Sequence, residues 1–335
     1  MLDAADSTTR PLVSIIVLSF NQREFLRGCL ASVRGQTYQP REVLVVDNAS
    51  TDGSAGMVQE ELPEVRLLVL RKNYGYAGGH NRGIRESRGA FVLLLNADVL
   101  LEPTYLEELV RVMDHDPKIG MVQGKLYQMG DRMQSAGGRR LDSTGIVIHR
   151  NRRTLLRGYG EVDRGQYDDQ REVFAPDGAA PLYRRTMLED IRYHEEYFDE
   201  AFFLYREEVD LGWRARWRGW QAVFAPRAMG WHVRRYVPGG RRDQPRWLRR
   251  IQFRNRYYLL LKNESWRGLA RDAGPILWFE VRALVYTLCR EPHYLLAYGE
   301  VLKGLVRLLA WRRAMMRKRR VSPQALGRWL RGDSP

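Results

Sequence analysis

Cysteine is scarce in this chain of 335 residues, and several other sequence features are missing. The two cysteines, Cys29 and Cys289, cannot build a disulfide framework or a zinc cluster, which favours a reducing compartment. No run of roughly 18 uncharged apolar residues occurs, so the sequence predicts no membrane-spanning helix. Residues 1–9 lack the basic flank and apolar core of a secretory signal, so we expect a cytoplasmic protein.

Positive charge is concentrated in the C-terminal third. Residues 227–335 contain 25 Lys or Arg and 7 Asp or Glu, a balance of +18, whereas residues 1–226 contain 30 and 33, a balance of −3. Such a basic segment is typical of proteins that meet phosphates, on nucleic acid or on a membrane surface. No nucleic-acid-binding motif interleaves with the basic residues, so nucleic acid is not the expected partner.

The first hundred residues alternate apolar runs with helical patterns. The apolar runs that predict strands are residues 13–19, 42–46, 65–70 and 91–95. Strands separated by helices of this length predict right-handed crossovers and a mainly parallel sheet covered on both faces. Ligands bind such sheets beyond the carboxyl ends of the strands. Polar clusters stand at three of those ends, in residues 19–21, 47–50 and 96–98.

The rest of the chain changes character twice. Residues 127–177 are rich in Gly, Arg and Asp and predict loops and short strands. A helix is predicted for residues 208–218, closed by Gly219, and a short strand and turn for residues 222–232. Beyond about residue 236 the sequence is helical and rich in Arg, Trp, Leu and Tyr. The predicted fold class is therefore α/β, a mixed, mainly parallel sheet flanked by helices, with a C-terminal amphipathic helical extension.

Two polar clusters and a glycine-rich loop are candidate nucleotide-binding elements. The Asp47 carboxylate can accept a hydrogen bond from a nucleobase, although taken alone its setting is more typical of an Asx turn with a helix N-cap at Ser50 or Thr51. Glycines in residues 73–83 would let backbone N–H groups approach a phosphate, but their spacing fits neither a Walker A loop nor a dinucleotide fingerprint. Asp98 is suited to hold Mg²⁺ or Mn²⁺ against a diphosphate, although such a strand end is usually a turn.

Adjacent carboxylates at Glu207 and Glu208 give the sharpest catalytic signal. They repel each other, so at least one has a raised pKa if the site is partly buried, as a general base requires. They follow the apolar residues 198–205, where solvated charge is not expected; the alternative is an acidic first turn of a helix. His232 is a candidate metal ligand, although a lone histidine is more often structural.

Together, and in this order, these stretches resemble the inverting family-2 glycosyltransferases with the GT-A fold. The resemblance covers roughly the first two-thirds of the chain. The stretches that carry it are residues 13–21, 45–54, 73–83, 95–98, 202–211 and His232. The helical tail is similar to that of bacterial rhamnosyltransferase-like members of the family.

The resemblance implies roles for individual residues. Phe20 and Asp47 match positions that contact the base of a nucleotide sugar, and Asn73 and Gly75 match the loop near the nucleoside diphosphate. Asn21 and Asn96 complete the expected nucleotide-binding residues.

The resemblance also implies a metal site and a base. Asp98 matches the final carboxylate of the Asp-x-Asp metal motif, and His232 matches a metal ligand of several members. Glu208 matches the catalytic base, with Glu207 as the runner-up.

Two positions depart from the family pattern. Asn96 replaces the first acid of the metal motif, which leaves one charge fewer for a cation, and Glu208 is one methylene longer than the commoner Asp.

The basic tail predicts a membrane-associated region. Residues 294–313 place apolar side chains along one side of a helix, and Trp278, Phe279, Leu284 and Leu288 suggest a similar helix upstream. We expect a catalytic domain in residues 1–235, with nucleotide-sugar binding in 11–126 and the acceptor and catalytic part in 127–235. Residues 236–335 are expected to lie peripherally on the anionic inner face of the cell membrane. The alternative is that these apolar stripes pack on the catalytic domain.

The expected function follows from the resemblance. It is metal-dependent (Mg²⁺ or Mn²⁺) transfer of a sugar, with inversion, in the synthesis of a cell-envelope polysaccharide. The best match for the donor is dTDP-L-rhamnose, with UDP-sugars left open. The acceptor hydroxyl would belong to a glycan or to a polyprenyl-diphosphate-linked molecule. The alternatives are a basic nucleic-acid-binding protein and a nucleotidyltransferase, although the first strand-to-helix loop lacks the glycine-rich signature of the latter.

Overall fold

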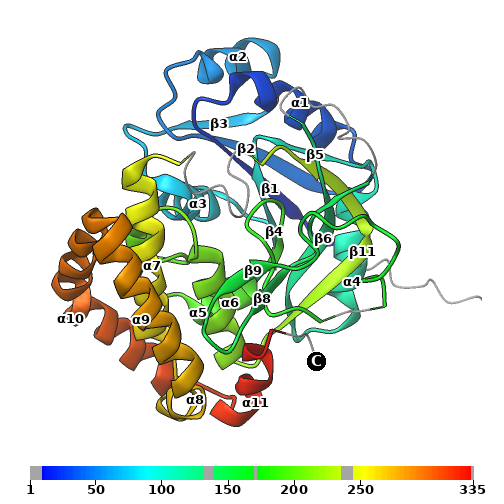
Figure 1. The fold of residues 1–335 in the computed structure, drawn as a ribbon. Coiled ribbons are helices and arrows are strands. Elements are labelled where there is room, and N and C mark those ends of the chain that lie inside the picture. Colours follow the sequence, from blue (N-terminus) through cyan, green and yellow to red (C-terminus); the bar gives the residue numbers. More distant parts are fainter. Residues whose placement is uncertain (1–9, 131–138, 170–171, 235–243, 333–335) are drawn as a thin grey trace, which may run out of the picture.

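A computed structural model describes residues 10–130, 139–169, 172–234 and 244–332. Its centre is a nine-stranded sheet with the strand order β3-β2-β1-β4-β10-β6-β11-β5, and β7 pairs with β6 (Figure 1). The strands are β1 (Val13–Ser19), β2 (Arg41–Asp47), β3 (Arg66–Val69), β4 (Phe91–Asn96), β5 (Val99–Leu101), β6 (Ile119–Gln128), β7 (Leu141–Ser143), β10 (Leu182–Arg184) and β11 (Gln221–His232). A separate hairpin pairs β8 (Ile146–Ile148) with β9 (Thr154–Leu156). The prediction of a mixed, mainly parallel sheet is confirmed.

Helices cover both faces of the sheet because successive strand residues point to opposite sides. In β1, Val13, Ile15 and Val17 enter one core and Ile16 enters the other. The first core also contains side chains of α1 (Arg23–Arg34), α2 (Ser54–Glu61) and α4 (Tyr105–His115). The second contains side chains of α3 (Gly75–Glu86), α5 (Arg185–Ile191) and α6 (Glu207–Trp217).

Strand register brings the polar strand ends to one edge of the sheet. Ser19 is opposite Asp47 in the parallel pair β1 and β2, and Leu18 is opposite Asn96 in the pair β1 and β4. From the other half of the sheet, β11 runs antiparallel to β5 and places His232 opposite Val99, the residue after Asp98. Residues distant in sequence therefore meet at one rim.

The expected short strand and turn at residues 222–232 is a single strand, β11, twelve residues long. Its register against β6 shifts between Ala225 and Met229, so a bulge takes up the irregularity without ending the strand. The turn prediction was wrong here, because pairing with β6 and β5 on its two sides keeps the segment extended.

The C-terminal third is helical, as predicted. It contains α7 (Arg246–Asn263), α8 (Trp266–Arg271), α9 (Ala273–Arg290), α10 (Leu295–Arg317) and α11 (Pro323–Gly327) (Figure 1). Side chains of α6, α7, α10 and α11 share one apolar cluster, so part of the tail packs on the sheet-bearing body. The boundary expected at residue 235 and the N-terminal stretch 1–9 lie outside the described residues. No helix among the described residues has both the length and the hydrophobicity needed to cross a membrane.

A buried ammonium fastens α7 to this body. Lys262 Nζ donates to Asp199 Oδ2 at 2.8 Å and to Asp210 Oδ2 at 2.9 Å, and all three side chains are almost completely buried. Asp199 also pairs with Arg307 of α10, and Asp210 with Arg214 of α6. The cluster links α6, α7, α10 and the segment that precedes α6.

We predict that Lys262→Met lowers the free energy of unfolding by about 3–5 kcal/mol, since it leaves two buried carboxylates without their shared cation. Urea denaturation of the purified variant measures this loss. Lys303→Met, at an exposed lysine of α10, is the matched control and is expected to stay within about 0.5 kcal/mol of wild type. Equal stability of the two variants would contradict the structural role of the cluster.

Candidate active site

The backbone just before α6 has an unusual conformation, which hydrogen bonds from a side chain of another helix stabilise. In residues 202–206, which we call the pre-α6 loop, Phe203, Tyr205 and Arg206 have φ values of 64°, 70° and 73°. Non-glycine residues adopt this left-handed region at a cost and keep it only where the surroundings impose it. Asn255 of α7 does so, because its Nδ2 donates to the carbonyl oxygens of Phe202, Leu204 and Tyr205 at 2.8, 3.0 and 2.8 Å.

The glycine-rich loop also contacts the pre-α6 loop. Ala77 N donates to the carbonyl oxygen of Phe203 at 3.3 Å. Gly75 has a φ of +69°, and a Cβ atom there would collide with the same carbonyl. Glycine at position 75 therefore allows the glycine-rich loop and the pre-α6 loop to pack closely against each other.

The two carboxylates that follow the pre-α6 loop line one cavity of about 370 Å³. Glu207 is buried and Glu208 is half-buried. Burial and the nearby Asp177 raise the pKa of Glu208, a backbone hydrogen bond and the arginines Arg206 and Arg234 lower it, and the resulting pKa is about 7. Burial and the neighbouring Glu208 raise the pKa of Glu207 well above its usual range. Near neutral pH, Glu208 is thus the member of the pair that can both lose and accept a proton.

His232, from the end of β11, also lines this cavity and faces Asp98. Its Nε2 lies 3.5 Å from Asp98 Oδ1, and its Nδ1 is hydrogen-bonded to Asp142 Oδ2 at 2.9 Å. Burial lowers the pKa of His232, but the Asp142 and Asp98 carboxylates together outweigh burial and bring the pKa to about 9. The imidazole is therefore protonated at neutral pH when no metal ion is bound beside it.

A divalent cation fits between Asp98 and His232. Asp98 Oδ1 is buried and has no hydrogen-bond partner among the described residues, while Oδ2 accepts from Gln22 Nε2 at 3.0 Å. Asp142 holds the imidazole from behind, the arrangement in which a carboxylate orients a metal-binding histidine. An unpartnered carboxylate oxygen facing an oriented ring nitrogen is a suitable ligand pair for Mn²⁺ or Mg²⁺.

A second acidic grouping overlaps this pair. Oxygen atoms of Asp142 and Asp177 and a ring nitrogen of His232 all lie within 4.8 Å of one another. Arg234, however, donates to both Asp142 and Asp177, with its closest contact to Asp177 Oδ2 at 2.7 Å. This guanidinium already neutralises the two carboxylates, whereas Asp98 Oδ1 and His232 Nε2 face each other without it.

The expected nucleotide-binding residues lie at the neighbouring strand ends. Asp47 Oδ2 accepts from Ser50 N at 3.0 Å, whereas the buried Oδ1 has no hydrogen-bond partner in the described part of the chain. Asn73 is engaged internally, since its Oδ1 accepts from Gly75 N and from Asn48 Nδ2. Asn21 Oδ1 accepts from Thr51 N at 2.8 Å.

The structure groups the sequence-predicted residues in two neighbouring sets. Asn96, Glu207, Glu208 and His232 line the cavity, and Asp98 joins them through His232. The residues outside the cavity lining are Phe20, Asn21, Asp47, Asn73 and Gly75. They lie on or next to β1, β2 and α3 at the same rim. Phe20 is 41 % exposed and therefore open to a ligand.

Sequence reasoning missed Asp142, Asp177 and Arg234. Arg234 carried a signal, because residues two apart in an extended segment point to the same side and Arg234 follows His232 at that spacing. Asp142 and Asp177 carried none, since both lie in the irregular region where the sequence shows no clear period.

Comparison with known proteins identifies the family. The model of glycosyl transferase family 2 matches residues 14–192, more than half of the chain. A relative from Mycobacterium tuberculosis, named N-acetylglucosaminyl-diphospho-decaprenol L-rhamnosyltransferase, is 28 % identical over 248 residues. This alignment covers 68 % of the present chain and 78 % of the relative.

Two solved structures share the fold at low identity. GalNAc-T7, crystallised with UDP, GalNAc and Mn²⁺, matches 76 % of this chain with a TM-score of 0.58 and 14 % identity. The chain spans about half of that protein, 48 % of its length. Residues 1–349 of S. aureus TarS, in complex with UDP-GlcNAc, match 91 % of this chain and 88 % of that one, with a TM-score of 0.55 and 17 % identity. The protein belongs to glycosyl transferase family 2 and has the GT-A fold.

Proposed function

We propose that this glycosyltransferase moves a sugar from a nucleotide donor to an acceptor hydroxyl with inversion, and that Glu208 is the base. The observation that carries the proposal is the cavity in which Glu208, with a pKa of about 7, shares a wall with His232 and Asn96. An alcohol is a weak nucleophile until a carboxylate takes its proton during attack. Attack from the side opposite the leaving group inverts the anomeric carbon.

Neighbouring groups prepare Glu208 for this role. The pre-α6 loop, fixed by Asn255, sets the direction of the side chain at the start of α6. Asp177 and burial keep the carboxylate basic, and Arg234 limits that effect. Asp98 and His232 would hold a Mn²⁺ or Mg²⁺ ion, which supplies charge stabilisation for the departing nucleoside diphosphate.

The donor binds, in this proposal, along the adjoining strand ends. The free Oδ1 of Asp47 is suited to accept from the N–H of a pyrimidine base, and the exposed ring of Phe20 is suited to stack on it. Asn21, Asn73, Gly75 and Asn96 frame the remaining path toward the cavity. We propose a dTDP- or UDP-linked donor, with L-rhamnose as the sugar, because the M. tuberculosis relative is named for L-rhamnosyl transfer.

We propose a polyprenyl-diphosphate-linked acceptor, like the one in the name of the same relative, and peripheral attachment to an anionic membrane. The surface for this attachment is the outer face of α9. Six of its exposed apolar side chains fall within an arc of roughly 120° at 3.6 residues per turn. They are Leu277, Trp278, Val281, Leu284, Val285 and Leu288, between 45 and 65 % exposed.

Charge on and around α9 matches an anionic bilayer. Arg282 and Arg290 on the helix are exposed, as is Arg267 on the preceding α8. Glu280, the acidic residue of α9, points the other way and is bound by Arg256 and Tyr257 of α7. An apolar stripe bordered by arginines is typical of a helix that lies in the headgroup region, where each cation contributes about 1 kcal/mol. This surface lies upstream of the stripe expected in residues 294–313, of which Tyr294 and Val301 are buried.

The pH dependence of transfer tests Glu208 as the base. The folded pKa of about 7 means that the carboxylate is protonated and inactive below pH 7, so kcat/KM is expected to rise as the pH increases through this value. Glu208→Gln, which cannot accept the proton, is expected to lower kcat by about 10² to 10⁴-fold and to bind the donor normally.

Glu207→Gln is the comparison variant, because it removes the neighbouring carboxyl. It is expected to keep a rising pH limb close to that of wild type, because the strongly raised pKa of Glu207 leaves this side chain uncharged near pH 7. If Glu208→Gln retained wild-type turnover, or if Glu207→Gln alone abolished it, Glu208 would not be the base.

Metal binding to the protein without substrate tests the role of Asp98. Titration with Mn²⁺, followed by electron paramagnetic resonance of the free ion, is expected to show a site that Asp98→Asn weakens by roughly tenfold or more. Asp169→Asn, at an exposed aspartate outside the cavity lining, is the matched control. Equal Mn²⁺ affinity of the two variants would exclude Asp98 as a ligand.

Vesicle flotation tests the α9 surface. At low salt the wild-type protein is expected to float with vesicles of phosphatidylglycerol and phosphatidylcholine. With vesicles of phosphatidylcholine alone, it is expected to remain in the bottom fraction of the gradient. The double variant Val281→Glu, Leu284→Glu is expected to lose most of the binding, whereas Val69→Glu, at an exposed valine of β3, keeps it.

Sedimentation of the same proteins without vesicles separates a membrane from a protein partner. A wild-type dimer that the double variant converts to a monomer would assign the α9 face to a second copy of the chain and overturn the membrane proposal. Unchanged flotation of the double variant would also overturn it.

A further inference from the structure

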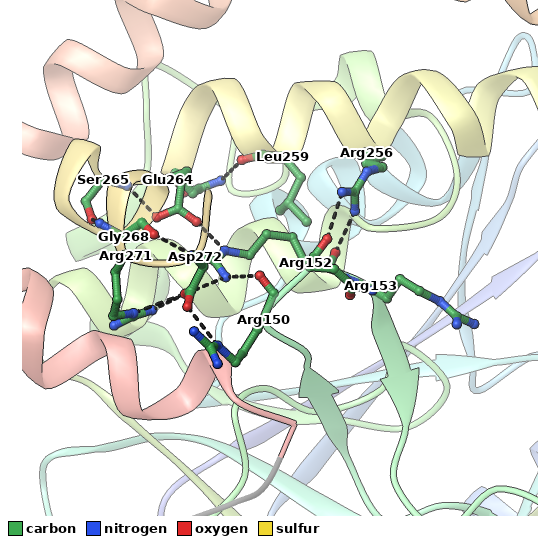
Figure 2. Close-up of polar contacts among 12 residues, drawn as sticks. Arg150, Arg152, Arg153, Arg256, Leu259, Glu264, Ser265, Gly268, Arg271 and Asp272 are labelled. Atoms are coloured by element: carbon green, nitrogen blue, oxygen red, sulfur yellow. Dashed lines mark hydrogen bonds and ion pairs between the residues drawn. The ribbon is translucent and has the colours of Figure 1, made fainter. Parts of the chain in front are cut away.

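The turn between β8 and β9 carries three arginines, two of which are fixed by buried acids. Arg152 is completely buried and pairs with Glu264 and Asp272, while Arg150 donates to Asp272 at 2.9 Å (Figure 2). Both acids lie at the ends of α7 and α8. The turn is therefore locked to the C-terminal helices.

The third arginine, Arg153, differs from its neighbours. Its guanidinium has no partner among the described residues, it is exposed, and it lines the same cavity as Glu208. Figure 2 shows its side chain extending away from the ion-pair cluster. Its backbone is nevertheless fixed, since its N–H donates to Asn151 Oδ1 at 3.0 Å and its carbonyl accepts from His149 N at 2.9 Å. The fixed backbone of this turn thus carries a guanidinium that has no ion-pair partner among the described residues.

The cavity lining contains both carboxylates and guanidinium groups. Glu207, Glu208 and Asp177 are among its acids, and its arginines are Arg153, Arg206, Arg234 and Arg256. Arg206 donates to Thr154 Oγ1, Arg234 to Asp177, and Arg256 to Glu280 and to the carbonyl oxygens of residues 151 and 152. Arg153 is therefore the lining arginine whose guanidinium is left for an anionic ligand.

The cavity that Arg153 lines also has apolar residues. Leu155 of β9 and Phe279 of α9 both line the cavity, and Arg256 lies 4.0 Å from the centre of the Phe279 ring. Phe279 belongs to the helix whose outer face carries the exposed apolar stripe. An amphiphile held at the membrane surface by its chain could place an anionic headgroup next to Arg153 without leaving the bilayer.

We propose that the part of the cavity between β9 and α9 binds the diphosphate of a prenyl-linked acceptor, with Arg153 as its ligand and Leu155 and Phe279 against the first prenyl carbons. This inference rests on the proposed function and names the acceptor class for the same cavity. In the proposed function the donor diphosphate is bound with the cation that Asp98 and His232 would hold, so a second anion requires a second cationic group. A guanidinium binds two phosphate oxygens at once, which suits this role.

Binding of geranyl diphosphate, a short and water-soluble prenyl diphosphate, tests the proposal. Calorimetric titration is done on the full chain with saturating UDP or dTDP and Mn²⁺, so that the donor diphosphate site is filled. Wild-type protein is expected to bind the probe, and Arg153→Gln to bind it about tenfold more weakly, as expected for the loss of a charge-assisted hydrogen bond. Arg164→Gln, which removes an exposed arginine outside the cavity, is expected to bind like wild type.

Two outcomes would overturn the inference. One is equal affinity of wild type and Arg153→Gln for the probe. The other is loss of all probe binding when the nucleotide and Mn²⁺ are present, which would place the prenyl diphosphate in the donor site. Nucleotide binding measured in the same experiment keeps the two proposals apart, because a protein that binds no nucleotide fails as a glycosyltransferase whatever Arg153 does.

Discussion

The contact between α7 and the segment that precedes α6 determines the shape of the candidate active site. Lys262 joins Asp199 to Asp210, on either side of the pre-α6 loop, and Asn255 donates to three carbonyls of that loop. Without these donors the left-handed residues would relax, and the two buried acids would lose the ammonium that they share and keep only Arg307 and Arg214 as counter-charges. The helical tail is therefore part of the machinery that positions Glu207 and Glu208, and not simply an appendage that reaches a membrane.

The acids in and beside the cavity have different electrostatic surroundings. Asp142 and Asp177 are neutralised by Arg234, and Asp142 also pairs with His232. Glu207 has no paired cation among the described residues and has a strongly raised pKa, while burial and two nearby arginines act in opposite directions on the pKa of Glu208. A carboxylate with a pKa near neutrality suits proton transfer, and of these acids Glu208 meets that condition.

Much of the catalytic half could be predicted from the sequence because its signals are local. Strands such as Val13–Ser19 and Phe91–Asn96 are continuous apolar runs, and the polar residues after them mark the rim. The pairing of Glu207 with Glu208 was visible because the two residues are adjacent. What could not be predicted depends on contacts between distant segments, such as Asn255 with Phe202 or Asp142 with His232. The periodicity of apolar and polar residues along the sequence does not indicate which distant residues will be in contact. The amphipathic pattern of the tail likewise did not reveal that the buried side of α10 faces α7. Nor did it reveal that α9 has the larger stripe of exposed apolar side chains.

The central claim is that one carboxylate, Glu208, deprotonates an alcohol that displaces the nucleotide in a single step. The anomeric configuration of the product tests it most directly. Transfer from a nucleotide sugar of known configuration to a prenyl-diphosphate-linked acceptor, followed by measurement of the one-bond carbon–proton coupling at the new linkage, is predicted to show inversion. Retention of the donor configuration would contradict the account, because a single displacement cannot produce it.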